Sequence, residues 1–202
     1  MRREAIDLWL SIGSTYSFLT VMRMRKVEVK YGVKFNLRPF SVREIMVEMD
    51  NIPFADKPVK YDYMWRDIER RAELFGIKAK VPAPYPLTGF DLANQVAVLG
   101  MQQGWGRDYV LATYQLWFQR GEPAGQEPNL SKSLKSIGLE PEEVIAAALS
   151  DETVAAYKLA TSQARQLGIF GAPSFVTRGE MFWGDDRLEE AVLWHLERRL
   201  ED

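Results

Sequence analysis

The chain has 202 residues, of which 47% are hydrophobic and 27% are charged, and its net charge is −2. This composition is ordinary for a globular protein with a hydrophobic core, and the charge favours neither nucleic acid nor an anionic membrane as a partner. The sequence has no cysteine and one histidine, which excludes disulfides, zinc–thiolate sites and catalysis by a protein thiol, and argues against a His-rich metal site or a Ser-His-Asp triad.

The beginning of the chain, residues 1–7, lacks the apolar core of a signal peptide. No apolar run in the sequence approaches the length that spans a membrane. We therefore expect a cytoplasmic protein without a membrane partner.

The first forty residues predict a β-α-β unit. Residues 5–11 form an apolar run typical of a strand, and residues 15–31 keep apolar side chains at helical spacing until Gly32, a typical helix end. Residues 33–39 alternate apolar and polar side chains, as a half-buried strand does, and Pro39 ends the alternation. This order favours two parallel strands joined by the helix.

The loop between the first strand and the helix carries small polar residues. Ser14 stands at the predicted helix start, so we expect its hydroxyl and the nearby backbone N–H groups to face outward. A helix N-terminus has unpaired N–H donors and the positive end of the helix dipole, and so suits an anion, including a thiolate. The spacing Ser14-x-x-Ser17 is that of a thioredoxin-type Cys-x-x-Cys motif, with oxygen in place of sulfur.

The middle of the chain, from residue 41 to residue 167, has a predominantly helical pattern. Residues 41–44 have the spacing of a capping box, residues 81–87 predict a proline-rich connector, and Thr88 with Asp91 predicts the start of a further helix. The predicted helical segments are 58–75, 88–103, 105–120, 130–137, 141–149 and 151–167.

Strand signals return near the end of the chain. Residues 174–177 and 181–183 predict an antiparallel hairpin with a turn at 178–180. Asp185 is expected to cap a last helix, whose apolar face contains Leu188, Val192, Leu196 and Leu200.

The proline that precedes this hairpin, Pro173, opens a strand within the segment 168–176. A cis Ala172–Pro173 bond would turn the N–H and C=O of Ala172 toward a ligand. An ordinary trans proline at an edge strand is the alternative.

The predicted order is β-α-β, a helical insertion, and then β-β-α, which is the order of thioredoxin with helices inserted. We therefore predict an α/β, thioredoxin-like fold with a large inserted all-helical domain. Residues 1–50 and 168–202 make up the discontinuous thioredoxin-like domain, and residues 51–167 make up the inserted domain.

Five segments in this order resemble a known family over nearly the full length. Ser-Thr-Tyr-Ser-Phe-Leu at 14–19 resembles Ser-Pro-x-Ser-Tyr-Leu of the 2-hydroxychromene-2-carboxylate isomerases and the related kappa-class glutathione transferases, in the DsbA-type branch of the thioredoxin fold. The other segments are 37–40, 51–53 with 60–67, 168–175 and 182–188. Two residues depart from the family pattern. Thr15 stands where the family usually has proline, and Ser11 stands where an acidic residue is common.

The resemblance implies glutathione as the cofactor, with Ser14 as the catalytic residue. No histidine is placed to activate Ser14 as a nucleophile, so its expected role is to donate a hydrogen bond to the glutathione thiolate. The alternative is that Ser14 only caps the helix. The expected glutathione contacts are Ser14, Thr15, Tyr16, Asn51, Ala172, Pro173, Asp185 and Asp186.

The contacts away from Ser14 have individual expected roles. The backbone of Ala172 would pair with the cysteinyl part of the tripeptide, as an added strand would. The resemblance assigns Asp186 to the γ-glutamyl ammonium, and one of Asp185 and Asp186 is expected to serve the helix start instead. Asn51 either holds glutathione or is a turn residue.

Several further side chains have open assignments. Lys60, Arg66 and Arg70 recur at helical spacing, and they either form a solvated face or point toward a substrate carboxylate. His195 is expected to be a surface or packing residue.

The resemblance predicts a cis-trans isomerase that adds glutathione thiolate to a conjugated double bond and then expels it. The substrate would be a small conjugated or aromatic carboxylate, held in an apolar pocket between the two domains. A kappa-like glutathione transferase and a non-catalytic glutathione-binding module are the alternatives. The resemblance also implies a homodimer.

Overall fold

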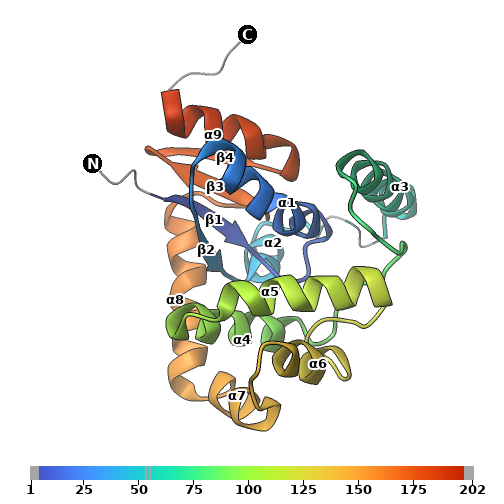
Figure 1. The fold of residues 1–202 in the computed structure, drawn as a ribbon, viewed down its shortest axis with the longest axis vertical. Coiled ribbons are helices and arrows are strands. Elements are labelled where there is room, and N and C mark those ends of the chain that lie inside the picture. The colour runs from blue at the N-terminus through green and yellow to red at the C-terminus, as the bar shows by residue number, and fades with distance from the viewer. Residues whose placement is uncertain (1–4, 53, 55, 198–202) are drawn as a thin grey trace.

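The structure of the protein, a computed structural model, describes residues 5–52, 54 and 56–197. Within this part, four strands form one mixed sheet in the order β2-β1-β3-β4 (Figure 1). The strands β1 and β2 are parallel, whereas β3 is antiparallel to both β1 and β4, which confirms the predicted parallel pair and hairpin. The strand bounds are β1 Ile6–Leu10, β2 Phe35–Pro39, β3 Ser174–Thr177 and β4 Glu180–Trp183.

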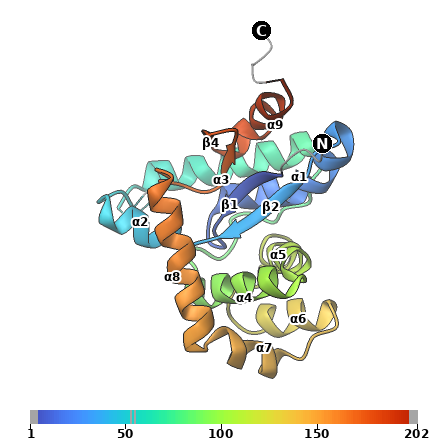
Figure 2. The same cartoon turned by 90° about the vertical axis from the view of Figure 1, so that its left-hand side faces the viewer.

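Helix α1 connects β1 to β2, and α9 follows β4 in the sequence. The two helices contact each other, and α3 packs against α1 (Figure 2). The helices α4 to α7 form the lower part of the molecule in the same view, and α8 runs along one side from β2 toward α7. The helix bounds are α1 Thr15–Tyr31, α2 Val42–Glu48, α3 Pro58–Phe75, α4 Phe90–Gln103, α5 Gly106–Gln115, α6 Asn129–Ser136, α7 Pro141–Ala148, α8 Asp151–Gln166 and α9 Leu188–Glu197.

The hairpin between β3 and β4 turns at Arg178 and Gly179, within the predicted turn 178–180, whose last residue, Glu180, instead begins β4. Arg178 and Gly179 both have positive φ angles, 51° and 81°. A two-residue hairpin turn of this kind needs positive φ at both positions, and glycine adopts it without steric cost. The turn therefore fixes the register in which Ser174 pairs with Trp183.

The hydrophobic core joins the sheet to the helical part. Strand β2 alternates buried and exposed residues, as its pattern predicts. On the helical side, the ring of Phe18 in α1 stacks on Phe118, with centroids 4.0 Å apart. Phe118 belongs to the π-helix Leu116–Arg120, which continues α5. Both sides of the predicted domain division thus contribute to one described hydrophobic cluster, and the division itself stays a prediction.

Two predicted helix starts are wrong. The helix expected from Thr88 begins at Phe90 without a side-chain cap, because Thr88 accepts a hydrogen bond from Gln126 and Asp91 accepts one from Tyr157. Asp185 does not cap the last helix, because it begins the 3₁₀ helix Asp185–Arg187 and its side chain binds other partners.

The last helix is otherwise as expected over the described residues, although Leu200 of its predicted apolar face lies outside them. His195 is a packing residue and not a surface one, since it is 4% exposed and its Nδ1 lies 2.7 Å from the hydroxyl of Thr177. In the part of the chain that the structure describes, we find no helix with both the length and the apolar character to cross a bilayer.

Candidate functional site

The site is built on the turn from β1 into α1, residues 11–14. The N–H of Ser14 donates to the carbonyl of Ser11 at 2.9 Å, and the buried hydroxyl of Ser11 donates to the carbonyl of Phe40 at 2.7 Å. Gly13 has a φ of 131° and lies so close to Phe90 that a Cβ would be 2.4 Å from the ring. Glycine is therefore needed here both for its backbone and for its lack of a side chain.

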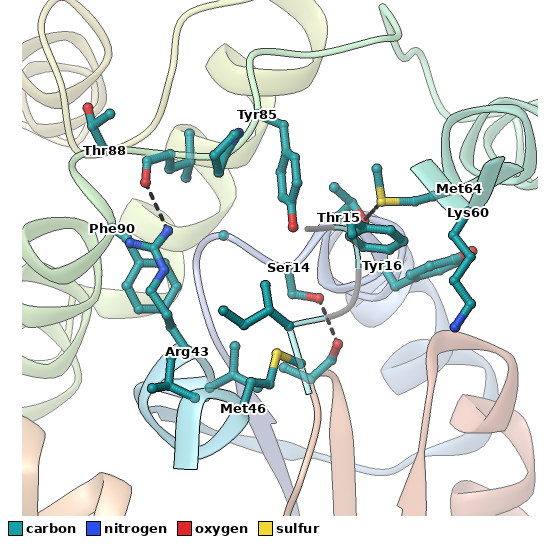
Figure 3. Close-up of a pocket in the computed structure, with 18 of the residues that line it drawn as sticks. Ser14, Thr15, Tyr16, Arg43, Met46, Lys60, Met64, Tyr85, Thr88 and Phe90 are labelled. Atoms are coloured by element: carbon teal, nitrogen blue, oxygen red, sulfur yellow. Dashed lines mark hydrogen bonds between the residues drawn. The ribbon is translucent and has the colours of Figure 1, made fainter. Parts of the chain in front are cut away.

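Ser14 is the N-cap of α1 and also faces the late proline segment. Its hydroxyl oxygen accepts a hydrogen bond from the N–H of Ser17 at 3.3 Å and donates one to the carbonyl of Ala172 at 2.6 Å (Figure 3). The Ala172–Pro173 bond is cis, as predicted. The fold thus brings together two residues that are 158 positions apart in the sequence.

A cavity of about 710 Å³ opens in front of Ser14. We call it the apolar cavity, since much of its wall consists of apolar side chains, among them Met46, Phe54, Met64, Leu87 and Phe90. None of the described residues that line it is acidic. A cavity of this size and character suits a small apolar molecule.

Two cationic side chains interrupt the apolar wall. Figure 3 shows Arg43 and Lys60 on opposite sides of Ser14. The guanidinium of Arg43 donates to the carbonyl of Leu87 at 2.9 Å and lies 4.2 Å from the ring centroid of Phe90. These contacts fix its position, so the apolar cavity has a positively charged edge. Arg43 is not among the candidate residues predicted from the sequence, although it lies just beyond the segment 37–40 that resembles the family.

The other two candidate cations of α3 do not line either described cavity. Arg66 forms an ion pair with Glu69, and Arg70 lies 3.4 Å from Asp67. Of these three basic residues, Lys60 is therefore the only one that lines a described cavity.

A second cavity of about 580 Å³ adjoins the first and shares four wall residues with it: Tyr16, Tyr63, Ala172 and Trp183. We call it the polar cavity, because its remaining wall is mostly charged and consists of Asp67, Arg71, Pro173, Gly184, Asp185, Asp186 and Arg187. The two cavities therefore meet beside the contact between Ser14 and Ala172.

The two consecutive aspartates in the polar cavity differ in their environment. The Asp185 side chain is fully buried, with one oxygen accepting from Thr20 at 2.9 Å and the other from Arg71 at 2.6 Å. The Asp186 side chain is 55% exposed, and its ion pair with Arg187 is long, 3.9 Å. Asp186 is therefore the aspartate that a ligand can reach, whereas Asp185 links α1 and α3.

Tyr16 lies at the junction of the two cavities. Its hydroxyl donates to a carboxylate oxygen of Asp67 at 2.9 Å. Burial, followed by this hydrogen bond, raises the pKa of Tyr16 above its usual value. The phenol therefore stays protonated and remains a hydrogen-bond donor at neutral pH.

The remaining two candidates differ in placement. Thr15 is buried and lines the apolar cavity, and its hydroxyl donates to the sulfur of Met64 at 3.1 Å, which joins α1 to α3. Asn51 is exposed and lines neither described cavity, although its neighbour Ile52 lines the apolar one. The structure thus brings together all the candidate contacts except Asn51.

A family model described as a DSBA-like thioredoxin domain matches residues 5–192. The chain belongs to the DSBA-like thioredoxin domain family. This DSBA-like chain is 25% identical over 189 residues to a 2-hydroxychromene-2-carboxylate isomerase of Sphingobium xenophagum, covering 92% of this chain and 95% of the relative. It is 24% identical over 195 residues to a glutathione S-transferase kappa 1 of Caenorhabditis elegans, covering 90% and 86%.

A solved structure of a 2-hydroxychromene-2-carboxylate isomerase superposes on the DSBA-like chain with a TM-score of 0.84. The two chains are 23% identical, and the match covers 96% of this chain and 97% of the other. These matches confirm the fold class and the family resemblance expected from the sequence. The relatives named here are an isomerase and a transferase.

In this DSBA-like domain, the two serines at Cys-x-x-Cys spacing have different access to a ligand. Ser14 lines the apolar cavity. Ser17 is fully buried and lines neither described cavity. Ser14 is therefore the serine that a molecule in the apolar cavity can reach.

Proposed function

We propose that the protein is a glutathione-dependent cis-trans isomerase of the 2-hydroxychromene-2-carboxylate isomerase type. It would add glutathione thiolate to a conjugated double bond of an aromatic or enone carboxylate and then expel it. The observation that carries the proposal is the meeting of a polar and an apolar cavity beside Ser14. One cavity suits a charged tripeptide and the other an apolar substrate, and the named relatives include both an isomerase and a glutathione transferase.

Glutathione would lie in the polar cavity with its sulfur toward Ser14. The exposed carboxylate of Asp186 suits the γ-glutamyl ammonium, and the backbone of Ala172 suits the cysteinyl amide. Pro173 and Tyr16 line the same cavity. The cysteinyl sulfur would then lie at the junction with the apolar cavity, where a substrate can approach it.

The hydrogen bond from Ser14 to Ala172 suggests how the hydroxyl becomes available. The cysteinyl N–H of glutathione would donate to the Ala172 carbonyl, which now accepts from Ser14. The Ser14 hydrogen would then rotate toward the sulfur while its oxygen stays bonded to the N–H of Ser17. A hydrogen bond to the thiolate, together with the N-terminus of α1, would favour the charged form of sulfur.

In the reaction, the thiolate forms a carbon–sulfur bond at the far end of the conjugated double bond, and the electron pair moves onto the conjugated carbonyl as an enolate. The former double bond is then a single bond and can rotate. The enolate re-forms the double bond and expels the thiolate, so glutathione is not consumed. The Arg43 and Lys60 side chains would attract the substrate carboxylate.

Calorimetry with reduced glutathione tests the first half of the proposal. We expect saturable binding at millimolar concentration or below. Asp186→Asn should weaken binding about fivefold, because the ammonium loses a partly solvated charged partner. Asp62→Asn is the matched control, since Asp62 is an exposed acid on α3 that lines neither described cavity. The absence of glutathione binding to the unaltered protein would contradict the proposal.

The second half is tested with a cis-configured aromatic enone carboxylate. We expect its conversion to the trans isomer while the concentration of free thiol stays constant. A loss of thiol equal to the product formed would instead favour the transferase that the Caenorhabditis elegans relative represents. Glutathione binding without either reaction would favour a non-catalytic module. The homodimer and the cytoplasmic location stay predictions.

A further inference from the structure

Two buried side chains from the helical part hold the turn that carries Ser14. The first is Asn94 of α4, which is fully buried. Its side-chain oxygen accepts from the N–H of Ile12 at 2.8 Å, and its amide nitrogen donates to the carbonyl of Ile12 at 2.8 Å. The same nitrogen also donates to the carbonyl of Phe90 at 2.9 Å. Asn94 therefore satisfies both backbone groups of a residue in the middle of the turn.

The second is Tyr114 of α5, which is also fully buried. Its hydroxyl lies 3.0 Å from the carbonyl oxygen of Ser11 and 3.2 Å from that of Ser14. Its ring stacks on Trp117, with centroids 5.7 Å apart. Burial raises the pKa of Tyr114, so the hydroxyl remains a donor at neutral pH. One phenol thus contacts both ends of the turn.

These contacts leave the turn little freedom to move. A buried peptide group that loses its partner is costly, so the Ile12 peptide cannot rotate away from Asn94 without that cost. At the next residue, Gly13, the backbone lies against the ring of Phe90. The direction of the Ser14 side chain is therefore set by residues of α4 and α5, 80 and 100 positions further along the chain.

We infer that Asn94 and Tyr114 are positioning residues, which hold the hydroxyl of Ser14 in the direction of the glutathione sulfur. The inference rests on the proposed function, because it needs a bound thiol in front of Ser14. A hydrogen bond weakens steeply as its angle departs from linearity, and a supporting residue that lets a catalytic group move by about 1 Å lowers its contribution. Neither side chain lines a described cavity, so both would act through Ser14.

The test uses Tyr114→Phe, which removes only the hydroxyl and keeps the stacked ring. We expect the thiolate fraction of bound glutathione at neutral pH, measured by ultraviolet titration, to fall about three- to tenfold. Glutathione affinity should stay within about twofold, because the proposed contacts at Ala172 and Asp186 are unchanged. The matched control is Tyr109→Phe, since Tyr109 is equally buried on the same helix and its hydroxyl makes no hydrogen bond to residues 11–14.

A double variant shows whether Tyr114 acts through Ser14. In a Ser14→Ala background, Tyr114→Phe is expected to change the thiolate fraction less than about twofold, because effects of coupled residues are not additive. An equal effect in both backgrounds would overturn the inference. So would a Tyr114→Phe variant whose bound thiol titrates as in the Tyr109→Phe control.

A third variant, Asn94→Ala, leaves the Ile12 peptide without its buried partner. It should lower the thiolate fraction at least as much as Tyr114→Phe, and a failure to fold would leave the decision with Tyr114→Phe.

The proposed function is judged separately, on the unaltered protein. If that protein does not bind glutathione, both the function and the inference fall. If it binds glutathione with a lowered thiol pKa and Tyr114→Phe changes nothing, the inference alone falls.

Discussion

Ser14→Ala is expected to raise the pKa of the bound glutathione thiol by about one to two units. A charge-assisted hydrogen bond contributes about 1.5–3 kcal/mol, and one pKa unit corresponds to about 1.4 kcal/mol. At a pH below the pKa of the bound thiol in both proteins, the thiolate fraction should therefore fall about ten- to a hundredfold, and the rate with it. The acid limb of the pH–rate profile should move upward by the same one to two units, because the thiol must now lose its proton at a higher pH.

Ultraviolet titration of bound glutathione measures the shift directly. Glutathione affinity should change little, since Ala172 and Asp186 keep their proposed contacts. Ser17→Ala should change the thiol pKa less, because the Ser17 side chain is buried and lines neither described cavity. Loss of an N-cap alone would cost about 1 kcal/mol of folding stability and leave the thiol pKa unchanged. That result would reduce Ser14 to a capping residue.

Asp185→Asn is expected to lower the free energy of unfolding by about 3 kcal/mol. The substitution keeps the shape of the side chain and removes a fully buried charge whose partner, Arg71, lies 2.6 Å away. It also leaves Arg23, whose side chain is 7% exposed and 3.8 Å from Asp185, with less compensation. Removal of one member of a buried ion pair costs about 3–5 kcal/mol. We place the loss at the low end because Arg23 also pairs with Glu189.

Denaturant unfolding of two neighbouring variants measures this effect. Asp186→Asn makes the same chemical change one position along the chain, where the side chain is 55% exposed, and should change the free energy of unfolding by less than about 0.5 kcal/mol. Asp185→Asn should also weaken glutathione binding, because Arg71 belongs to α3 and α3 lines both cavities. Equal stabilities for the two variants would show that Asp185 is not the buried link described here.

The sequence predicted the order of the elements because each one carries a local signal. The helix 58–75 begins with proline and ends before glycine, as observed, and the hairpin turn contains Gly179, which adopts its positive φ without steric cost. These signals act within a few positions. They do not depend on how distant segments meet.

The features that sequence reasoning could not separate depend on distant contacts. Asp185 and Asp186 are the same residue type at the same helix start, and they differ because Thr20 and Arg71 donate their hydrogen bonds to Asp185. Asn94 reads as an ordinary polar residue in a helix, although its amide binds the Ile12 peptide 82 positions away. Arg43 gives no local sign that Phe90 and the carbonyl of Leu87 hold it at the cavity.

The single hydrogen bond between Ser14 and the Ala172 carbonyl has a consequence for which thiols the proposed enzyme would accept. A simple thiol brings a sulfur but no amide N–H, so it leaves the carbonyl bonded to Ser14 and the hydroxyl turned away. A cysteinyl peptide brings both groups at once and exchanges one hydrogen bond for two. Selection among cellular thiols would then depend on the peptide bond beside the sulfur, and the acidity of the free thiol in water would matter little.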